Sequence, residues 1–333
     1  MMLISNLIIF IAGLVLLVKG ADFFVKSAAA IAKKLGVSEF VIGLTLVAIG
    51  TSVPELAAGI AAVTRQASGI VIGNVVGSNI ANIGLVVGFA AMIATIKTKE
   101  EMLRRDGYIM LFAAVLFTFM IIDLRISRLE SGILLLFYVV YILFLLEEET
   151  HEQKYFLDFI DYFFKMQYVK TLGKLKGFGS RKKKGYSILS DVFFLALGAL
   201  GIIIGSNAMI EQAINFADYF GLSSTVIGFT LVALGTSLPE LSVTVSAFKK
   251  GYGSIALGNI IGSNIANIFL ILGVTGVMFA LPVTQLTLYL LAPFMVFISL
   301  LLLVAIKSGW ELKTAEGIFL IIIYVVFLVV VFL

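Results

Sequence analysis

The chain has 333 residues, 61% of them hydrophobic and only 13% charged, and it carries a formal net charge of +4. Soluble domains are roughly half apolar and a quarter charged, so this composition excludes a water-soluble globular fold. Cysteine is absent and His151 is the single histidine, which excludes disulfides, a Cys/His zinc site and a thiol catalyst. The composition gives no support for nucleic-acid binding, and the expected partner is the lipid bilayer.

Apolar stretches of about 20 residues predict membrane-spanning helices, and the chain has ten of them. They cover residues 3–32, 38–64, 69–96, 106–123, 129–146, 188–217, 224–248, 254–281, 284–306 and 311–333. One long polar segment separates the fifth span from the sixth. The sequence therefore predicts an all-α polytopic membrane protein, with a first five-helix half (1–146), a cytoplasmic linker (147–187) and a second five-helix half (188–333).

The basic residues predict how the chain is inserted. With the N-terminus outside, the inner loops hold 19 of the 24 Lys and Arg, and the outer loops hold only Arg65, Arg125 and Arg128. Basic residues concentrate in the cytoplasmic loops of membrane proteins. We therefore expect a multi-pass protein of the cell membrane with both termini extracytoplasmic.

The linker has two possible forms. It opens with three glutamates, 147–149, and closes with four basic residues, 181–184, around the mixed aromatic and charged stretch KYFLDFIDYFFKMQYVK. A solvated linker whose charges fix the topology is the favoured interpretation. The alternative is an amphipathic helix in the inner interface, with the basic run touching anionic lipid.

An internal repeat relates the two halves. At one constant offset and without a gap, VIGLTLVAIGTSVPEL from Val41 aligns with VIGFTLVALGTSLPEL from Val226, and GNVVGSNIANI from Gly73 aligns with GNIIGSNIANI from Gly258. We call residues that this alignment pairs repeat-related. Shared hydrophobicity does not explain 26 identities in 48 positions.

Each half has five spans, an odd number, so the second half enters the membrane upside down. The duplication therefore predicts two inverted-topology repeats. Inverted repeats are typical of secondary transporters, whose sites lie at the repeat interface near the midplane.

The repeat places two acids, Glu55 and Glu240, at equivalent positions in the middle of apolar spans. An ionisable group there costs on the order of 3 kcal/mol, so we expect both to handle ions or protons. Pro54 and Pro239 come directly before them. Each proline removes a helix hydrogen bond and frees backbone carbonyls that a cation can use.

Other polar residues of the repeated motifs can converge on the same place. The candidates are the hydroxyls before the prolines and the Ser and Asn pairs one helical turn apart: Thr51, Ser52, Thr236, Ser237, Ser78, Asn82, Ser263 and Asn267. Asn79 and Asn264 point elsewhere and are expected to join helices, while the pairs Gly73/Gly77 and Gly258/Gly262 allow close packing. Four charged residues on the first and sixth spans are expected to be interfacial: Lys19, Asp22, Lys26 and Glu211.

All of these candidate ligands are oxygens, which predicts a site for a hard cation. Ca2+ takes six to eight oxygens in a flexible geometry, whereas Mg2+ needs a tighter octahedron and softer metals prefer imidazole or thiolate. Two carboxylates balance one divalent ion, and the same oxygens can hold Na+ when Ca2+ leaves. Competition for shared ligands is the minimal physical basis of antiport.

The motif pairs GTSVPEL with GNVVGSNIANI and GTSLPEL with GNIIGSNIANI resemble the alpha-repeats of the cation/calcium exchanger superfamily, and most closely those of prokaryotic sodium/calcium exchangers. The resemblance covers both halves and implies alternating access, in which the first and sixth helices move past the other eight. It implies a calcium site at Glu55, Glu240, Thr51 and Thr236. It also implies sodium ligands from the carbonyls of Ala48 and Ala233 and the side chains of Ser52, Ser237, Ser78, Ser263, Asn82 and Asn267.

The chain departs from the family pattern at one position. Some prokaryotic members and the potassium-dependent branch have Asp where this chain has Asn267, which argues against potassium dependence and leaves the ion stoichiometry open. Proton/calcium members tend to have Asn-Ala where both repeats here keep Thr-Ser, which favours sodium. We therefore expect a Na+/Ca2+ antiporter that extrudes Ca2+ and has no cofactor, with antiport of H+ against Ca2+ or another divalent cation as the alternative.

Two other classes of function receive less support. An intramembrane hydrolase would need an HExxH, a GxSxG or paired aspartates in the spans, and none occurs, so we expect no enzyme activity. A passive channel would also place polar residues in the membrane, but the inverted repeat favours alternating access. Sustained single-channel currents would reverse that preference.

Overall fold

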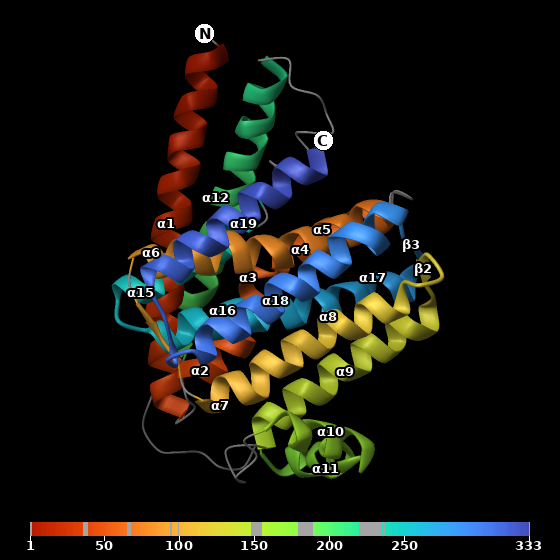
Figure 1. Ribbon diagram of the computed structural model, residues 1–333. Coiled ribbons are helices and arrows are strands. Elements are labelled where there is room, and N and C mark those ends of the chain that lie inside the picture. The colour runs from red at the N-terminus through yellow and green to blue at the C-terminus, as the bar shows by residue number, and fades with distance from the viewer. Residues whose placement is uncertain are drawn as a thin grey trace.

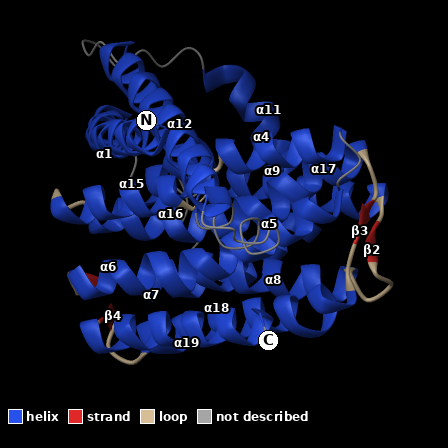
Figure 2. Cartoon of the chain, turned by 90° about the horizontal axis from the view of Figure 1, so that it is seen from above, coloured by secondary structure: helices blue, strands red, loops and turns tan. Residues whose placement is uncertain are grey.

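A computed structural model describes residues 2–35, 39–64, 68–93, 95–98, 100–147, 155–178, 189–219, 235 and 237–332, and almost all of this chain is helical (Figures 1 and 2). The helices of the first half are α1 (Met2–Leu35), α2 (Glu39–Ile42), α3 (Ala48–Thr51), α4 (Val53–Thr64), α5 (Ser68–Ala81), α6 (Gly88–Ile93), α7 (Glu100–Met102), α8 (Tyr108–Met120) and α9 (Arg128–Glu147). Two helices follow in the linker: α10 (Phe156–Phe164) and α11 (Gln167–Phe178). The helices of the second half are α12 (Leu189–Tyr219), α15 (Leu238–Lys249), α16 (Gly253–Ala266), α17 (Leu272–Met278), α18 (Ala292–Lys307) and α19 (Thr314–Phe332).

Turns of π-helix interrupt several of these helices. They are η1 (Gly43–Val47), η2 (Asn82–Val87), η3 (Leu103–Gly107), η6 (Asn267–Ile271) and η7 (Thr287–Leu291). A single turn of π-helix inside an α-helix is rare overall, but where one occurs it often lies at a functional site. Two of them, η2 and η6, begin at Asn82 and Asn267, two of the predicted site residues.

The described residues contain six helices that are long and apolar enough to cross a membrane, or seven if the bent pair 40–51 and 53–64 is one span. The multi-pass character is therefore confirmed. The predicted span 106–123, which contains the 13-residue α8, is not among these six. The predicted span 224–248 lies partly outside the described residues. The number ten stays a prediction.

Helices α1 and α12 lie side by side and cross the other helices steeply (Figure 1). Glycines bring the two backbones into contact. A Cβ atom at Gly20 would lie 2.8 Å from the carbonyl oxygen of Gly198, and one at Gly205 would lie 2.5 Å from the amide nitrogen of Leu17. Gly20 and Gly205 are repeat-related, so both halves supply the same small residue to one interface.

Two short antiparallel ribbons join loops of opposite halves. Strand β1 (Ile96–Lys97) pairs with β4 (Glu311–Leu312), and β2 (Arg125–Ile126) pairs with β3 (Leu281–Pro282). Strand β3 occupies the position that is repeat-related to β1, and β4 lies a single position beyond the one that is repeat-related to β2. Each ribbon therefore pairs the first strand of one half with the second strand of the other half.

The backbone around the two ribbons matches in detail. Leu124 precedes β2 and Trp310 precedes β4, and both have positive φ angles, 61° and 57°. The Leu124 carbonyl accepts the N–H of Val283 at 2.9 Å, and the Trp310 carbonyl accepts the N–H of Thr98 at 2.8 Å. Two bulky residues in the left-handed region, with equivalent partners, mark the loops as copies of one structure.

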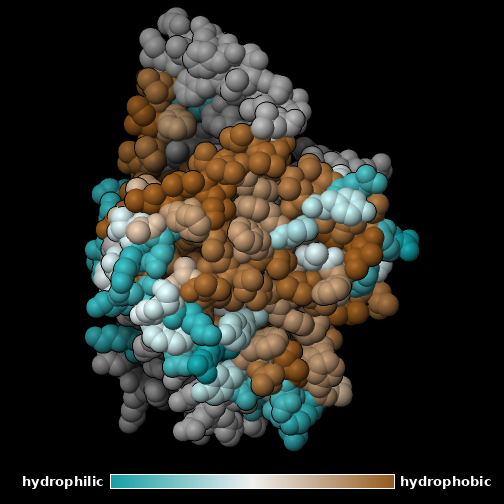
Figure 3. All heavy atoms as spheres, in the orientation of Figure 1, coloured by the Kyte–Doolittle hydropathy of each residue, from teal (hydrophilic) through white to brown (hydrophobic). Residues whose placement is uncertain are grey.

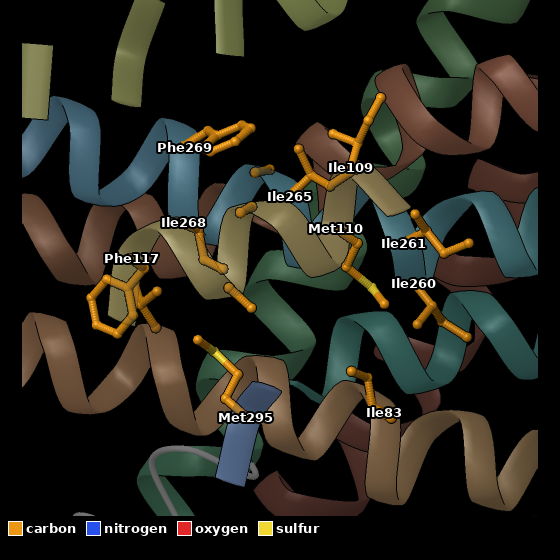
Figure 4. Packing of buried hydrophobic residues seen from close by; sticks show 14 of the residues in the cluster. Ile83, Ile109, Met110, Phe117, Ile260, Ile261, Ile265, Ile268, Phe269 and Met295 are labelled. Carbon is orange, nitrogen blue, oxygen red and sulfur yellow. The ribbon is translucent and has the colours of Figure 1, made fainter. Parts of the chain in front are cut away.

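Apolar side chains fill the bundle and also cover its outside. Buried residues of α8, α16 and α18 interlock in the interior (Figure 4). The face in Figure 3 is largely hydrophobic as well, and side chains such as Phe119, Phe297, Leu300 and Val304 are 48–67% exposed. Exposed apolar surface on this scale is expected against lipid and not against water.

A buried ion pair lies where η3 leads into α8. Arg105 donates to Asp106 Oδ2 from Nε (3.0 Å) and Nη2 (2.8 Å). The Tyr141 hydroxyl of α9 donates to Asp106 Oδ1 at 3.1 Å. The Arg105 and Asp106 side chains are 5% and 0% exposed. This contact fixes α8 to α9 near the start of α8.

The linker helices α10 and α11 pack against α9. The rings of Phe137 and Phe163 stack with centroids 4.4 Å apart. Tyr162 is buried and donates its hydroxyl to Thr171 at 2.8 Å, and Thr171 contacts Glu147 at the end of α9. Burial raises the pKa of Tyr162 to about 12, which keeps this donor protonated. The expectation of a solvated linker is therefore wrong for residues 156–171, because aromatic packing orders them.

Candidate cation-binding site

In each half a helix begins just before the acidic residue, at Val53 and at Leu238. Ser52 lies between α3 and α4 with φ −86° and ψ 4°, and Ser237 precedes α15 with φ −86° and ψ −1°. Pro54 and Pro239 then occupy the first turns of α4 and α15, where a missing N–H removes no helix bond. Around the first break the chain bends by 43°. The predicted break is therefore present in the first half, while the stretch before Ser237 lies largely outside the described residues. The expectation that each proline removes a helix hydrogen bond is wrong, because both prolines lie where a helix starts.

Glu55 and Glu240 lie in the first turns of the helices after these breaks. The free N–H groups and the dipole of a helix N-terminus favour a carboxylate there. Both side chains are 1% exposed, and their carboxylates are close enough to repel each other electrostatically. Glu240 also faces Thr51 and Ser52 of the opposite half, as well as Ser263. The structure thus brings the two acids together at one buried place.

Thr51 connects the buried pair of acids, Glu55 and Glu240, to α16. Its Oγ1 lies 3.0 Å from Asn259 Oδ1, 3.2 Å from the Ala48 carbonyl oxygen and 3.3 Å from Ser263 Oγ. Asn259 in turn donates from Nδ2 to Thr244 Oγ1 at 3.3 Å. One hydroxyl proton serves one acceptor at a time, so oxygen lone pairs remain available around Thr51.

Four asparagines form a buried cluster between the two halves. Asn82 donates to Asn264 Oδ1 at 3.3 Å, and Asn267 donates to Asn79 Oδ1 at 2.9 Å. Asn79 also donates from Nδ2 to the Asn264 carbonyl at 3.2 Å. Asn79 and Asn264 therefore join helices, as predicted. Their bonds hold the amide groups of Asn82 and Asn267 in fixed orientations.

Close backbone packing positions α16 beside the first break. A Cβ atom at Gly258 would lie 2.6 Å from the Phe40 carbonyl oxygen, and one at Gly262 would lie 2.5 Å from the Leu44 carbonyl oxygen. The predicted packing role of this glycine pair is confirmed. The same prediction is wrong for Gly73, where an added Cβ atom would meet nothing within 4 Å. Any larger side chain at Gly262 would push Ser263, the next residue, away from Thr51.

Six buried oxygen atoms at the breaks and in the asparagine cluster have no hydrogen-bond partner. They form three repeat-related pairs: Ser52 Oγ and Ser237 Oγ, Glu55 Oε2 and Glu240 Oε2, Asn82 Oδ1 and Asn267 Oδ1. Leaving a buried polar atom unpaired costs about 1–3 kcal/mol, so native proteins rarely do so. A cluster of free oxygen acceptors is instead the ligand set that a hard cation requires.

Ten of the twelve predicted site residues belong to the described chain, and Thr236 and Ala233 lie outside it. Ser78 is buried in α5, one turn before Asn82. The Ala48 carbonyl accepts the N–H of Ser52 at 3.0 Å. Within the described ranges no three His, Cys, Asp or Glu side chains gather in one place, so neutral oxygens would complete the ligand set around the acid pair.

Sequence reasoning missed several residues at this site. No role was predicted for Asn259, and its partner Thr244 has no signal in the sequence because the equivalent residue in the first half is Gly59. Met110 and Met295, labelled in Figure 4, were also missed. Their Sδ atoms lie 3.5 Å from Asn264 Nδ2 and 3.6 Å from Asn79 Nδ2. The two methionines are repeat-related, so extending the repeat comparison beyond its densest region would have paired them.

Comparisons with known proteins identify the family of the chain. The model of the family "Sodium/calcium exchanger protein" matches residues 5–147 and 190–333. The chain is 54% identical over 317 residues to sodium/calcium exchanger MaX1 of Methanosarcina acetivorans, covering 90% of each protein. It is 34% identical to an uncharacterized membrane protein of Methanocaldococcus jannaschii, covering 87% of this chain and 86% of that one.

Solved structures extend the similarity to the fold. The chain resembles the sodium-calcium exchanger NCX_Mj soaked with 10 mM Na+ and 10 mM Sr2+, with a TM-score of 0.80, 32% identity and 97% of both chains covered. The matched family consists of exchangers and not of enzymes. The chain therefore belongs to the sodium/calcium exchanger family, among the prokaryotic exchangers of the cation/calcium exchanger superfamily.

Proposed function

We propose that the chain is a secondary active antiporter that exchanges Na+ for Ca2+ across the cell membrane by alternating access, normally extruding Ca2+. The observation that carries the proposal is the set of six unpartnered, buried oxygens in three repeat-related pairs. Two of these oxygens belong to carboxylates, whose charges together balance one divalent ion. The relatives named sodium/calcium exchangers support the choice of ions.

The proposed architecture is ten spans in two inverted five-helix repeats, 1–146 and 188–333, with 147–187 cytoplasmic. Helices α4 and α15 have repeat-related first and last residues, and so do α5 and α16. The ribbons support the inversion. Within each half the two strands occupy consecutive loops, and consecutive loops lie on opposite sides of the membrane. Strands β1 and β4 therefore meet on one side only if the second half is inverted.

The proposed ligands follow the repeat. Glu55, Glu240, Thr51 and Thr236 would hold Ca2+, and Na+ would use the carbonyls of Ala48 and Ala233 with Ser52, Ser237, Ser78, Ser263, Asn82 and Asn267. Two ionised carboxylates without a cation would repel each other in a medium of low dielectric. Loading with Ca2+ or with Na+ removes that repulsion. Only a site that holds Ca2+ or Na+ avoids the repulsion between the two carboxylates. The conformational change that turns the site from one side of the membrane to the other is therefore coupled to ion binding.

Replacing the Na+ gradient by a pH gradient tests which ion is coupled to Ca2+ transport. In proteoliposomes we expect Ca2+ uptake when Na+ is high inside and low outside, with no uptake when a pH gradient replaces the Na+ gradient. Thr51 and Ser52 offer hydroxyl oxygens that suit Na+. Uptake of 45Ca2+ driven by the pH gradient alone, with Na+ absent, would replace this proposal by H+/Ca2+ antiport.

The proposed moving unit is α1 together with α12. Their backbones touch at glycines, and Lys34 of α1 pairs with Asp191 of α12, so the two helices can move together. Asp22 of α1 also bonds to α15: its Oδ1 accepts from Ser246 Oγ at 2.5 Å and from Lys250 Nζ at 2.9 Å. By the charge distribution, this contact lies toward the inner side. It holds α1 against α15 in the conformation described here.

We expect Asp22→Asn to open this inner contact more often. The pair is partly exposed, so the expected shift is about two- to fivefold in the conformational equilibrium. The chain has no cysteine, so Ala247→Cys, buried on α15, supplies a single reporter thiol. A membrane-impermeant thiol reagent added on the inner side should label it faster in Asp22→Asn. Asp191→Asn is the matched control, because it breaks a pair within the moving unit. Equal labelling in both variants would contradict the role of Asp22.

A further inference from the structure

A cavity of about 530 Å³ lies where the start of α8, the start of α10 and the end of α18 meet. Six residues line it: Arg104, Tyr108, Tyr155, Phe156, Leu157 and Lys307. None of them belongs to the cation site. Two are cationic and three are aromatic, a composition that the ion-exchange proposal does not use.

The charges of the cavity favour an anion. The Arg104 guanidinium lies 5.9 Å from the ring centroid of Tyr155 and donates to Glu100 at 2.6 Å. Both members of that ion pair are about half-exposed, so a competing anion displaces the carboxylate at little cost. Lys307 has no acidic partner among the residues that the structure describes. Of the six residues that line the cavity, two are cationic and none is acidic.

The cavity lies at the end of a lipid-facing surface. Phe297, Leu300, Val304 and Lys307 follow one another at spacings of three or four residues and so share a face of α18. The three apolar side chains are 48–58% exposed. Lys307 ends this apolar stripe with a positive charge. A ligand with apolar chains and an anionic head group matches this surface, with its chains on the apolar stripe and its head group at Lys307.

The linker helix α10 forms the other wall. The Tyr155 N–H donates to Asp158 Oδ2 at 2.9 Å, which caps the first turn of α10 and fixes the residues at the cavity. Phe156 packs tilted against Phe112 of α8, with centroids 5.6 Å apart. Leu157, in contrast, is 72% exposed at the cavity rim. An exposed leucine beside basic residues is typical of a segment at a membrane interface.

We propose that this cavity binds the phosphate headgroup of an anionic phospholipid of the inner leaflet, with the acyl chains along α18. The Arg104 fork, the Lys307 ammonium and the hydroxyls of Tyr108 and Tyr155 are the donors that a phosphodiester accepts. Phosphatidylcholine carries its own ammonium, which these cations repel, so the site discriminates by headgroup. The inference is independent of which ions the protein exchanges.

The single tryptophan provides the test. The Trp310 backbone N–H donates to the Ile306 carbonyl at 2.9 Å, which places Trp310 just after Lys307. In vesicles of the full chain, brominated phosphatidylglycerol in a phosphatidylcholine background should quench Trp310 fluorescence more than brominated phosphatidylcholine in a phosphatidylglycerol background. We expect a preference of about fivefold for phosphatidylglycerol, falling to about one in Arg104→Gln/Lys307→Gln.

The control is Lys165→Gln/Lys170→Gln, which removes the same charge from the linker helices outside the cavity and should keep the preference. Equal loss in both double variants would mean that general surface charge attracts the lipid, and it would overturn the proposal. Loss of the preference on adding inorganic phosphate would also overturn it, because the cavity would then be a site for soluble phosphate. Na+-driven 45Ca2+ uptake measured in the same vesicles reports separately whether each variant is folded.

Discussion

Replacing either buried acid should abolish Ca2+ exchange. In Glu55→Gln and Glu240→Gln the side-chain volume is kept, but one negative charge facing the cation is lost. Near a protein surface, two unit charges 4 Å apart interact by about 4 kcal/mol, which corresponds to roughly a thousandfold in affinity. Because both carboxylates are buried, no water replaces the lost ligand. Na+-driven 45Ca2+ uptake by proteoliposomes should fall to the level of empty vesicles.

The matched control is Glu316→Gln on α19, a carboxylate whose contacts are with Ser308 and the Lys313 N–H at the surface. It should transport like the unchanged protein. Exchange at normal rates in Glu55→Gln or in Glu240→Gln would exclude that residue from the site. Calorimetry in detergent separates the two possible defects, since a variant that binds Ca2+ normally but does not transport it has lost movement and not coordination.

The second large effect is expected on stability. Asp106→Ala removes the carboxylate that pairs with Arg105 and accepts from Tyr141. It takes an ionic partner away from a guanidinium that is 5% exposed, and breaking one side of a buried pair costs about 3–5 kcal/mol. The free energy of unfolding in mixed micelles should fall by this amount.

Two controls keep the interpretation specific. Asp123→Ala breaks the exposed pair with Arg125 and should leave unfolding unchanged. Arg105→Met/Asp106→Leu removes both buried charges and should be more stable than Asp106→Ala, because no uncompensated charge remains. A double variant as unstable as Asp106→Ala would show that the ion pair is needed for a reason other than charge compensation.

The repeat is what made the meeting of the two buried acids predictable. Glu55 and Glu240 were placed together because each motif occurs twice at a fixed offset, and the structure brings their carboxylates within electrostatic range. The same argument identified Gly258 and Gly262 as packing residues. Proline chemistry acts locally, so the helix break at Ser52 could also be predicted.

Features without a repeat or a period could not be predicted. The contact of Asn259 with Thr244 has no counterpart in the first half. The ribbons escaped notice because strands of two residues have no alternation to detect. The linker looked solvated because its charges are frequent, yet its order comes from stacking of Phe163 on Phe137 and related ring contacts, which are distant in sequence. Packing between segments decides such cases.

The central claim is that one Ca2+ is held by acids from both halves at once. Crystals soaked in Ca2+ and measured at long wavelength should give a single strong anomalous peak within about 2.3–2.6 Å of carboxylate oxygens of both Glu55 and Glu240, and Na+ in excess should remove it. A peak bound by only one of the two glutamates, or a peak elsewhere in the bundle with these carboxylates free, would contradict the account.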